Sequence, residues 1–260
     1  MPSIDESKCV LVTGATAGIG RALALSIAGL PSNPKVVAAG RRMDRLGELA
    51  QSNLDTVQID LDTDIDSLKK FVEDLVHKYP DLDTVVLCAG VQHEFDFKGE
   101  VNLAKLTSEI NINYTSIVAF ISFIMPHFLK LAAQGQPCFI VPVTSGLGIV
   151  PAPSVLNYAA SKAALRSFST SLRVQLRETN VHILEIIPPL VESELHDAYD
   201  TTEKLSRFWM PLDEYTKITL EGLRRGDPYI SAGASEDAFR RFEVEKYELA
   251  EAFQRHRETW

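Results

Sequence analysis

Short, almost entirely apolar runs alternate with longer amphipathic runs along most of this chain, and that alternation limits the possible folds more than any other feature. A strand that is apolar along its whole length is buried on both faces, as in parallel sheets covered by helices on both sides. The pattern therefore predicts an α/β fold with a doubly wound, Rossmann-type parallel sheet. The expected strands are 8–14, 35–40, 56–60, 84–90, 138–144 and 181–187, and the expected helices end near residue 29 or cover 42–52, 65–78, 103–133 and 155–179.

No internal repeat, low-complexity tract or Pro/Gly/Ser linker interrupts the alternation, so the sequence predicts a single domain over residues 1–260. Residues 190–226 are less regular and carry apolar side chains, and we expect them to form a short insertion that covers a substrate. After a short strand at 227–233, apolar side chains recur at roughly helical spacing over 235–258. This C-terminal helix should pack on the body or on a second subunit.

Charge and cysteine content disfavour several kinds of function. The net charge is −9 and no basic cluster is interleaved with aromatic residues, which argues against nucleic acid or an anionic membrane as a partner. The 3 cysteines are unclustered, and neither Cys-x-x-Cys nor His-x-x-x-His occurs, so we expect free thiols and no metal site. No basic and apolar leader precedes the first strand, and no run approaches about 18 apolar residues, so a soluble cytoplasmic protein is expected.

The first strand leads through TGATAGIG, residues 13–20, directly into a helix. Gly14, Gly18 and Gly20 are spaced Gly-x-x-x-Gly-x-Gly, so the Gly-x-Gly-x-x-Gly pattern is absent. The physical demand is the same: a tight turn, close approach of the backbone to a pyrophosphate, and free amides at a helix N-terminus. Three glycines can also serve a tight turn alone, but the strand-turn-helix setting favours phosphate binding.

The end of the second strand indicates which dinucleotide binds. An NAD site usually has a carboxylate here for the ribose 2′-hydroxyl, whereas this chain has Gly40 followed by Arg41 and Arg42. Guanidinium groups suit a 2′-phosphate, so we expect NADP(H), bound mainly through Arg41. The alternative is a solvated arginine pair at the start of a surface helix. Asp60 could accept a hydrogen bond from the adenine amino group or cap the next helix.

The segment NYAASKAAL, residues 157–165, carries Tyr158 and Lys162 four residues apart. Side chains at that spacing share one face of a helix, so the ammonium can lower the pKa of the phenol and prepare it for proton transfer. A tyrosine that packs in the core beside a solvent-directed lysine would show the same letters. The pair needs support from the rest of the sequence.

That support comes from Asn113 and Ser145. With the glycine turn and the Tyr-Lys pair in this order, the chain resembles the short-chain dehydrogenase/reductase family over nearly its whole length. Ser145 ends CFIVPVTS at the family's spacing before Tyr158, and Asn113 in EININYTS fits the family's Asn-x-x-(Gly/Ser) segment better than Asn111 does. The resemblance implies that Tyr158 is the general acid or base, Lys162 lowers its pKa and holds the nicotinamide ribose, Ser145 binds the substrate oxygen, and Asn113 anchors a water for proton resupply.

Two positions depart from the family pattern. Cys88 replaces the asparagine of Asn-Ala-Gly after the fourth strand, so a bracing amide is missing and we expect a looser turn there. Pro189 stands where many members have glycine. The segments VQHEFDF, TSGLGIVPAP and EIIPPLVESELHD also resemble a bacterial and fungal branch labelled after the D-alanyl-lipoteichoic acid cluster.

The resulting interpretation is an NADPH-dependent carbonyl reductase that acts on a fairly apolar ketone or diketone. One alternative is an NAD(P)-dependent dehydrogenase of secondary alcohols, and its NAD-dependent form is disfavoured by Gly40 and the arginines. The other is a non-catalytic NADP(H)-binding sensor, against which the complete Ser-Tyr-Lys-Asn set argues. The resemblance also implies a homodimer or homotetramer that pairs the helices around Asn113 and Tyr158.

These interpretations name specific residues. The expected catalytic residues are Asn113, Ser145, Tyr158 and Lys162. The expected cofactor contacts are Gly14, Thr16, Gly18, Ile19, Gly20, Arg41, Arg42, Asp60, Leu61, Ala89, Gly90, Tyr158, Lys162, Pro188 and Val191. The expected substrate pocket is built from His93, Phe95, Val150, Leu156, Leu195, Phe208 and Trp209.

Overall fold

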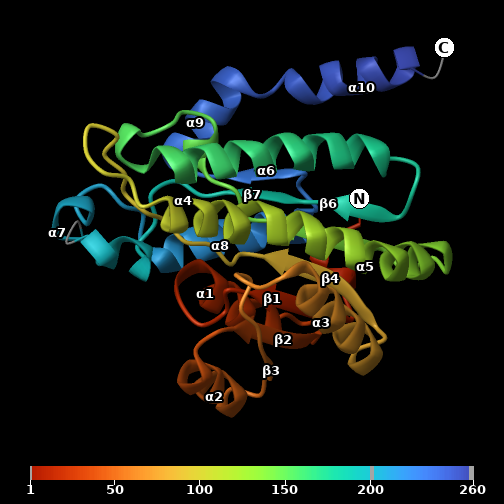
Figure 1. Cartoon of the computed structure of the whole chain (residues 1–260). Coiled ribbons are helices and arrows are strands. Elements are labelled where there is room, and N and C mark those ends of the chain that lie inside the picture. Colours follow the sequence, from red (N-terminus) through yellow and green to blue (C-terminus); the bar gives the residue numbers. More distant parts are fainter. Residues whose placement is uncertain (1, 200–201, 258–260) are drawn as a thin grey trace.

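A computed structural model describes residues 2–199 and 202–257, and its centre is a six-stranded parallel sheet in the order β3-β2-β1-β4-β5-β6 (Figure 1). The predicted doubly wound sheet is confirmed. The strands are β1 Cys9–Thr13, β2 Lys35–Gly40, β3 Asp55–Gln58, β4 Leu82–Leu87, β5 Cys138–Pro142 and β6 Val181–Ile183.

Helices bury both faces of this sheet. One face packs against α3 (Ile65–Lys78), α5 (Ser116–Ala133) and α6 (Leu156–Gln175), with strand residues such as Leu11, Val37 and Val85 in the shared core. The other face packs against α1 (Gly18–Ala28), α2 (Met43–Gln51) and α8 (Leu212–Arg225), with Val10, Val36 and Val86 in the core. Successive strand residues point to opposite faces, so a strand with helices on both sides has to be apolar throughout.

The strand order reverses between β1 and β4, which are neighbours in the sheet. At their carboxyl ends the glycine turn follows β1, and residues 88–90 follow β4. Loops that leave two adjacent strands toward opposite faces open a crevice at that edge, and ligands of doubly wound folds bind there. The topology therefore places the predicted cofactor residues at one end of the sheet.

The expected strand 181–187 is two strands. β6 ends at Ile183, and after Leu184 the chain forms β7 (Glu185–Ile187), which pairs with β8 (Tyr229–Ser231) in a separate two-stranded sheet. Leu184 and Glu185 mark the switch, because Leu184 N–H donates to Ile140 of β5 and Glu185 N–H donates to Pro228. Because the sequence of this segment is largely apolar throughout, it does not indicate that the pairing changes from β5 to β8.

The expected C-terminal helix 235–258 is also two elements, α9 (Gly233–Phe242) and α10 (Lys246–Arg257). At the break, the Glu243 carboxylate accepts a hydrogen bond from buried Arg166 of α6. The insertion 190–226 contains a 3₁₀ turn (Glu194–Tyr199), α7 (Thr202–Leu205) and the regular helix α8. Residues 200–201 of that insertion, and residue 258 of the predicted terminal helix, lie outside the described residues.

Helix α4 (Leu103–Ile110) continues through a π-helical turn (Asn111–Thr115) into α5. Within the described residues this stretch, Leu103–Ala133, is the one helix long and apolar enough by length and composition to cross a membrane, with a mean hydropathy of 1.7 in its most apolar window. Only 33% of that window is buried within one copy of the chain. Part of its surface therefore presents apolar side chains outward.

Candidate active site

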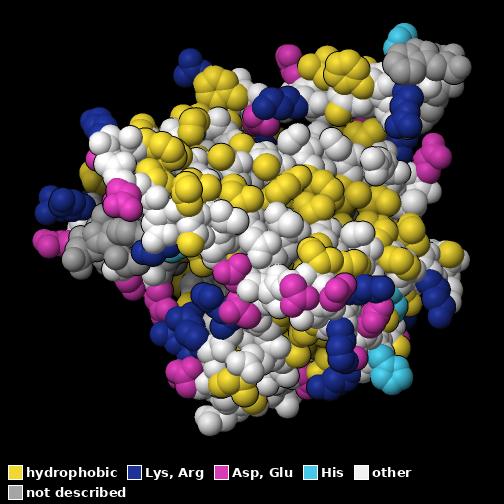
Figure 2. Space-filling view, viewed as in Figure 1, with side chains coloured by type: hydrophobic (Ala, Val, Ile, Leu, Met, Phe, Trp, Pro, Cys, Tyr) yellow, Lys and Arg dark blue, Asp and Glu magenta, His cyan; other side chains and the backbone are white. Residues whose placement is uncertain are grey.

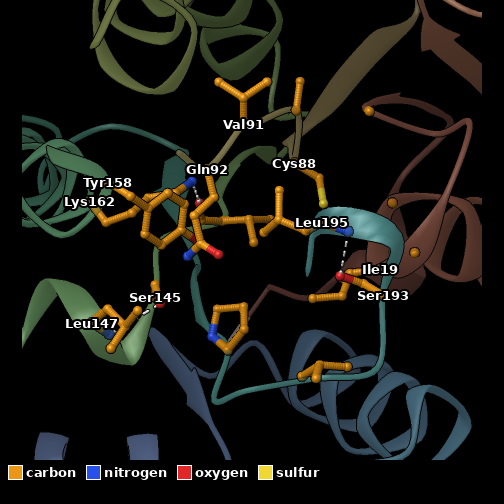
Figure 3. Close-up of a pocket in the computed structure, with 18 of the residues that line it drawn as sticks. Ile19, Cys88, Val91, Gln92, Ser145, Leu147, Tyr158, Lys162, Ser193 and Leu195 are labelled. Carbon is orange, nitrogen blue, oxygen red and sulfur yellow. Dashed lines mark hydrogen bonds between the residues drawn. The ribbon is translucent and has the colours of Figure 1, made fainter. Parts of the chain in front are cut away.

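A cavity of about 930 Å³ lies at the carboxyl ends of the strands. The glycine turn, the ends of β2 to β5, the start of α6 and the insertion after β7 all contribute to its wall, and Figure 3 shows part of it. Every residue expected to contact the cofactor lines this cavity, as does Ser145. Residues that are far apart in the sequence are thus brought to one place by the topology.

The glycine turn has the close approaches that its spacing suggested. Gly14 and Gly18 adopt positive φ angles of 67° and 49°, which only glycine adopts readily. A Cβ atom on Gly14 would lie 2.8 Å from the Ala89 Cα, and one on Gly20 would lie 2.4 Å from the Gly14 carbonyl oxygen. The turn therefore packs backbone against backbone beside the cavity, and its shape fits the cradle that a pyrophosphate requires.

The turn after β4 is braced despite Cys88. Thr13 Oγ1 accepts hydrogen bonds from the backbone N–H groups of Cys88 and Ala89, at 3.1 and 3.2 Å. Thr13 ends β1, so this hydroxyl ties the ends of the two central strands together. The expectation of a looser turn overlooked this bond, because it joins residues far apart in the chain.

Gly40 lies close to the glycine turn. A Cβ atom at this position would lie 2.6 Å from the Thr16 Cγ2, so a larger residue would require the Thr16 side chain to move. Of the two arginines that follow, Arg41 lies 3.8 Å from the Asp60 carboxylate and is largely exposed. Arg42 donates from Nε and Nη2 to Thr16 Oγ1 at 3.2 and 3.1 Å.

Two further charged residues, Arg45 and Glu194, join the contacts of Arg42 and were not predicted. Arg42 Nη1 and Arg45 Nη1 each donate to one oxygen of Glu194, at 2.8 and 2.5 Å. Arg45 could have been suspected, because it follows Arg42 by one turn of α2. Glu194 lies 152 residues from Arg42, and nothing local in the sequence marks that contact.

Tyr158 and Ser145 lie together in the wall of the cavity (Figure 3). Tyr158 lies in the first turn of α6 and is 7% exposed, while Ser145 follows β5 and accepts a hydrogen bond from the Leu147 N–H. Burial raises the pKa of Tyr158 to about 12, and a hydrogen bond with Ser145 opposes this only in part. The expected lowering of this pKa by Lys162 is not seen as a net effect, because burial of the phenol raises the pKa.

Lys162 is buried one turn further along α6. Its Nζ lies 5.6 Å from the centre of the Tyr158 ring and donates to the Val143 carbonyl at 2.9 Å. Burial lowers the pKa of Lys162 to about 8, against the opposing effect of Cys88 and Glu109. The ammonium is therefore held beside the tyrosine at a pKa close to neutrality.

Asn113 sits in the π-helical turn and is fully buried. Its side chain forms a pair of hydrogen bonds with the Val91 backbone, at 2.9 and 2.8 Å, and Nδ2 also donates to Ser161 Oγ at 3.1 Å. Widened turns of this kind occur often at functional sites. The side-chain amide therefore braces the loop after β4 against α6, and the expected role of Asn113 in anchoring a water stays a prediction.

Glu109 is a buried carboxylate that the sequence analysis did not single out. Its two oxygens accept from the His93 N–H at 2.8 Å and from Asn157 Nδ2 at 2.6 Å. It therefore joins the loop after β4 to the residue before Tyr158. Burial raises the pKa of this carboxyl group, and the Asn157 hydrogen bond opposes the shift.

The expected substrate residues divide into two groups. Val150 and Leu195 line the cavity. The other five are not among the described residues that line the cavity. The Phe95 ring is buried and lies 6.3 Å from the His93 ring. Leu156 and Phe208 are exposed, and Trp209 is half-buried outside the cavity. Apolar or small lining residues that were not predicted include Val91, Leu147, Ala152, Val155, Leu205, Ala234 and Ala238.

Comparison with known proteins shows which family the chain is similar to. A model of the family described as short chain dehydrogenase matches residues 8–204. An oxidoreductase named DltE from Bacillus subtilis (strain 168) is 37% identical over 226 residues, which cover 85% of this chain and 86% of that protein. An NADP-dependent 3-hydroxy acid dehydrogenase from Schizosaccharomyces pombe is 28% identical over 73% of each chain.

Solved structures share the fold. A short-chain dehydrogenase/reductase from Burkholderia phymatum, crystallised with NAD, superposes with a TM-score of 0.78 at 21% identity and covers 96% of each chain. At 21% identity this match supports the fold but not the role of any single residue. The ligand in that crystal belongs to that protein.

Proposed function

Because the chain belongs to the short-chain dehydrogenase family, we propose that it is an NADPH-dependent carbonyl reductase with Tyr158 as proton donor. The observation that carries the proposal is the joint placement of Tyr158, Ser145 and Lys162 beside a glycine turn in one cavity. When bound, the cofactor supplies the hydride. Every other task in the reaction falls to side chains of this chain.

The glycine turn and the residues that follow β2 to β4 would hold the dinucleotide. Because a Cβ atom at Gly14 or Gly20 would clash with neighbouring backbone, the turn exposes bare backbone at these positions. The N-terminus of α1 offers free amides to a diphosphate. Lys162 would hold the nicotinamide ribose hydroxyls. Pro188 and Val191, from the segment after β7, would close the nicotinamide end.

In the reduction, Tyr158 would donate its phenolic proton to the carbonyl oxygen of the substrate. A pKa raised to about 12 keeps the phenol protonated at neutral pH, the form that a proton donor needs. Ser145 would donate a hydrogen bond to the same oxygen and stabilise the charge that develops there. The Lys162 ammonium would stabilise the phenolate left behind.

The preference for NADP(H) rests on Gly40 and the arginines that follow it. Position 40 carries no carboxylate, and Arg41, Arg42 and Arg45 lie around the end of β2. Loss of a charge-assisted phosphate contact in Arg41→Ala should weaken NADPH about 10- to 150-fold and leave NADH nearly unchanged. Equal affinity of the parent protein for NADH and NADPH, measured by calorimetry, would refute the preference.

The proposed substrate is a fairly apolar ketone or diketone, because Val91, Leu147, Val150 and Leu195 line the same cavity as Tyr158. The test is NADPH consumption by the purified protein against a panel of aryl ketones and diketones. Turnover of several members, lost in Tyr158→Phe, supports the reductase. Tight NADPH binding without turnover of any ketone or secondary alcohol would favour the second candidate, a non-catalytic NADP(H) sensor.

We also propose a homodimer or homotetramer. The outward faces of α5 and α6 carry small and apolar residues, and Figure 2 shows hydrophobic side chains gathered over the region where these helices lie in Figure 1. A contiguous exposed apolar surface of this kind is typical of an interface. A cytoplasmic location is proposed because all 3 cysteines are free thiols, as expected in a reducing compartment.

A further inference from the structure

Glu194 occupies an unusual position for an acidic residue. Each of its carboxylate oxygens accepts a hydrogen bond from a different guanidinium group, Arg42 at 2.8 Å and Arg45 at 2.5 Å. Arg42 is the N-cap residue of α2, so the carboxylate also lies near the positive end of that helix. Two guanidinium groups at a helix N-terminus form the kind of site that phosphate oxygens occupy.

The contact joins two functional parts of the protein. Arg42 and Arg45 are anchored to the glycine turn, through the Thr16 hydroxyl and the Thr16 carbonyl respectively. Glu194 lies near the start of the insertion 190–226, called the cover below, where it begins a 3₁₀ turn. The preceding Ser193 lies so near the glycine turn that its Cβ would be 3.2 Å from a Cβ on Gly18. The first residues of the cover therefore rest on the cofactor end of the cavity (Figure 3).

The charge of Glu194 partly balances the positive charge of Arg42 and Arg45. Hydrogen bonds from Arg45 and then Arg42 hold the pKa of Glu194 below its ordinary value, so the group is a carboxylate at neutral pH. Arg41, the remaining arginine at the end of β2, lies near Asp60. A phosphate group that binds here must compete with the Glu194 carboxylate for the N–H groups of Arg42 and Arg45.

We propose that Glu194 is a built-in competitor of the cofactor's 2′-phosphate. Its carboxylate holds Arg42 and Arg45 when no phosphate is bound, a 2′-phosphate displaces it, and the displacement frees the start of the cover. The inference rests on the proposed use of NADP(H). Its consequence is specific: Glu194 lowers affinity for ligands that carry a 2′-phosphate and does not affect ligands that lack one.

The test compares two fragments of the cofactor, adenosine 2′,5′-bisphosphate and adenosine 5′-monophosphate, by calorimetric titration of the intact protein. Glu194→Gln keeps the shape of the side chain and removes its charge. The matched control is Glu192→Gln, the same change two residues away, where the carboxylate accepts only from the Leu212 N–H among the contacts described. Both side chains are exposed, and thermal melting checks that each variant is folded.

Glu194→Gln should bind the bisphosphate about 3- to 10-fold more tightly than the wild type, the size expected when two exposed ion pairs no longer compete. Its affinity for the monophosphate should stay within about 2-fold, and Glu192→Gln should match the wild type for both ligands. An equal gain for both ligands, no gain, or weaker binding of the bisphosphate would overturn the proposal. If wild type and variants all bind the two ligands equally, the NADP(H) preference itself fails.

Limited trypsin proteolysis tests whether the start of the cover is released. Lys204 and Arg207 are exposed trypsin sites in the cover, and Lys69 on α3 serves as a distant reference. In the wild type, saturating bisphosphate should raise cleavage at the cover sites relative to Lys69, and saturating monophosphate should not. Glu194→Gln should be cleaved there at the higher rate without ligand. Equal relative rates in all samples would overturn the release of the cover.

Discussion

At the scale of single residues, the hydroxyl of Tyr158 is the atom on which the proposed chemistry depends. Tyr158→Phe keeps the ring in its buried site and removes the acidic proton. Turnover should fall at least about 10²- to 10⁴-fold, while NADPH affinity stays within a few-fold. Steady-state kinetics and calorimetry measure the two effects. Tyr247→Phe on α10, which loses only a bond to Glu251, should keep wild-type turnover. A Tyr158→Phe variant that retains most of its turnover would contradict the assignment.

Burial of Lys162 predicts how stability depends on pH. The pKa of Lys162 is about 8 in the folded protein and near the ordinary lysine value of 10.5 when the chain is unfolded. Below pH 8 both states are protonated, and the folded state bears the full cost of a buried ammonium. Between these two values the unfolded chain holds more protons, so this group makes stability rise with pH.

Lys162→Met removes that contribution. The free energy of unfolding of the wild type minus that of Lys162→Met should therefore rise by about 1–3 kcal/mol from pH 7.5 to pH 10, a range around the pKa of about 8. Urea denaturation at several pH values measures the difference, and Lys69→Met on the exposed surface of α3 should show no such trend. A constant difference across this range would show that Lys162 titrates outside it.

At the scale of elements, Arg166 links three of them. Its guanidinium pairs with Glu185 of β7 at 2.7 Å and with Glu243, between α9 and α10, at 3.1 Å. Arg166→Met would leave the fully buried Glu185 without the cation that is hydrogen-bonded to it, and Glu185 Oε2 already has no hydrogen-bond partner among the described residues. Loss of one partner of a buried ion pair costs about 3–5 kcal/mol.

Urea denaturation tests this cost against Arg240→Met, which removes an exposed pair with Glu236 and should change stability by about 0.5 kcal/mol or less. Replacing Glu185 by Leu in the Arg166→Met background should restore part of the loss, since no buried charge then lacks a partner. Similar losses in Arg166→Met and Arg240→Met would contradict the buried role.

The cover gives a second prediction at this scale. Leu205, in α7, lines the cavity, whereas Phe208 is 79% exposed and does not appear in the described lining. Leu205→Ala should raise KM for a bulky aryl ketone about 10-fold more than for a small one, the value of one or two lost apolar contacts. Phe208→Ala should leave both KM values near the wild type. If only Phe208→Ala changed the two KM values selectively, the substrate would contact Phe208 and not Leu205.

These elements show what a sequence can and cannot reveal. The strands, the glycine turn and the Tyr158–Lys162 pair were predictable, because each depends on residues within a few positions of one another. The split at Leu184, the break at Glu243 and the Glu194–Arg42 contact depend on partners distant in sequence. The pKa of Tyr158 was mispredicted for the same reason, since its burial is set by the packing of the whole site.

At the scale of the whole molecule, one face of the chain is not covered by its own residues. Most outward positions of α5 and α6 are small or apolar, among them Ser122, Leu129, Ala160, Ala163 and Ser167. Small side chains let two helices approach closely, and a two-fold axis would place the same strip on both partners. Helix α10 extends beside α6, so its exposed apolar residues border this face (Figure 1).

Ala163→Glu tests this face as an interface. The substitution points a carboxylate outward from α6, away from the buried side that holds Lys162, so the fold should survive. In a symmetric pair each copy would have to bury a new charge against apolar surface, which strongly disfavours association. By light scattering at micromolar concentration, the wild type should have at least twice the 28.8 kDa mass of one chain, and Ala163→Glu should lose half of its mass or more. Gly47→Glu, at an exposed position on α2 with no atom within 4 Å of a Cβ, should keep the wild-type mass. A monomeric wild type, or an Ala163→Glu variant of unchanged mass, would show that the face meets no second copy of the chain.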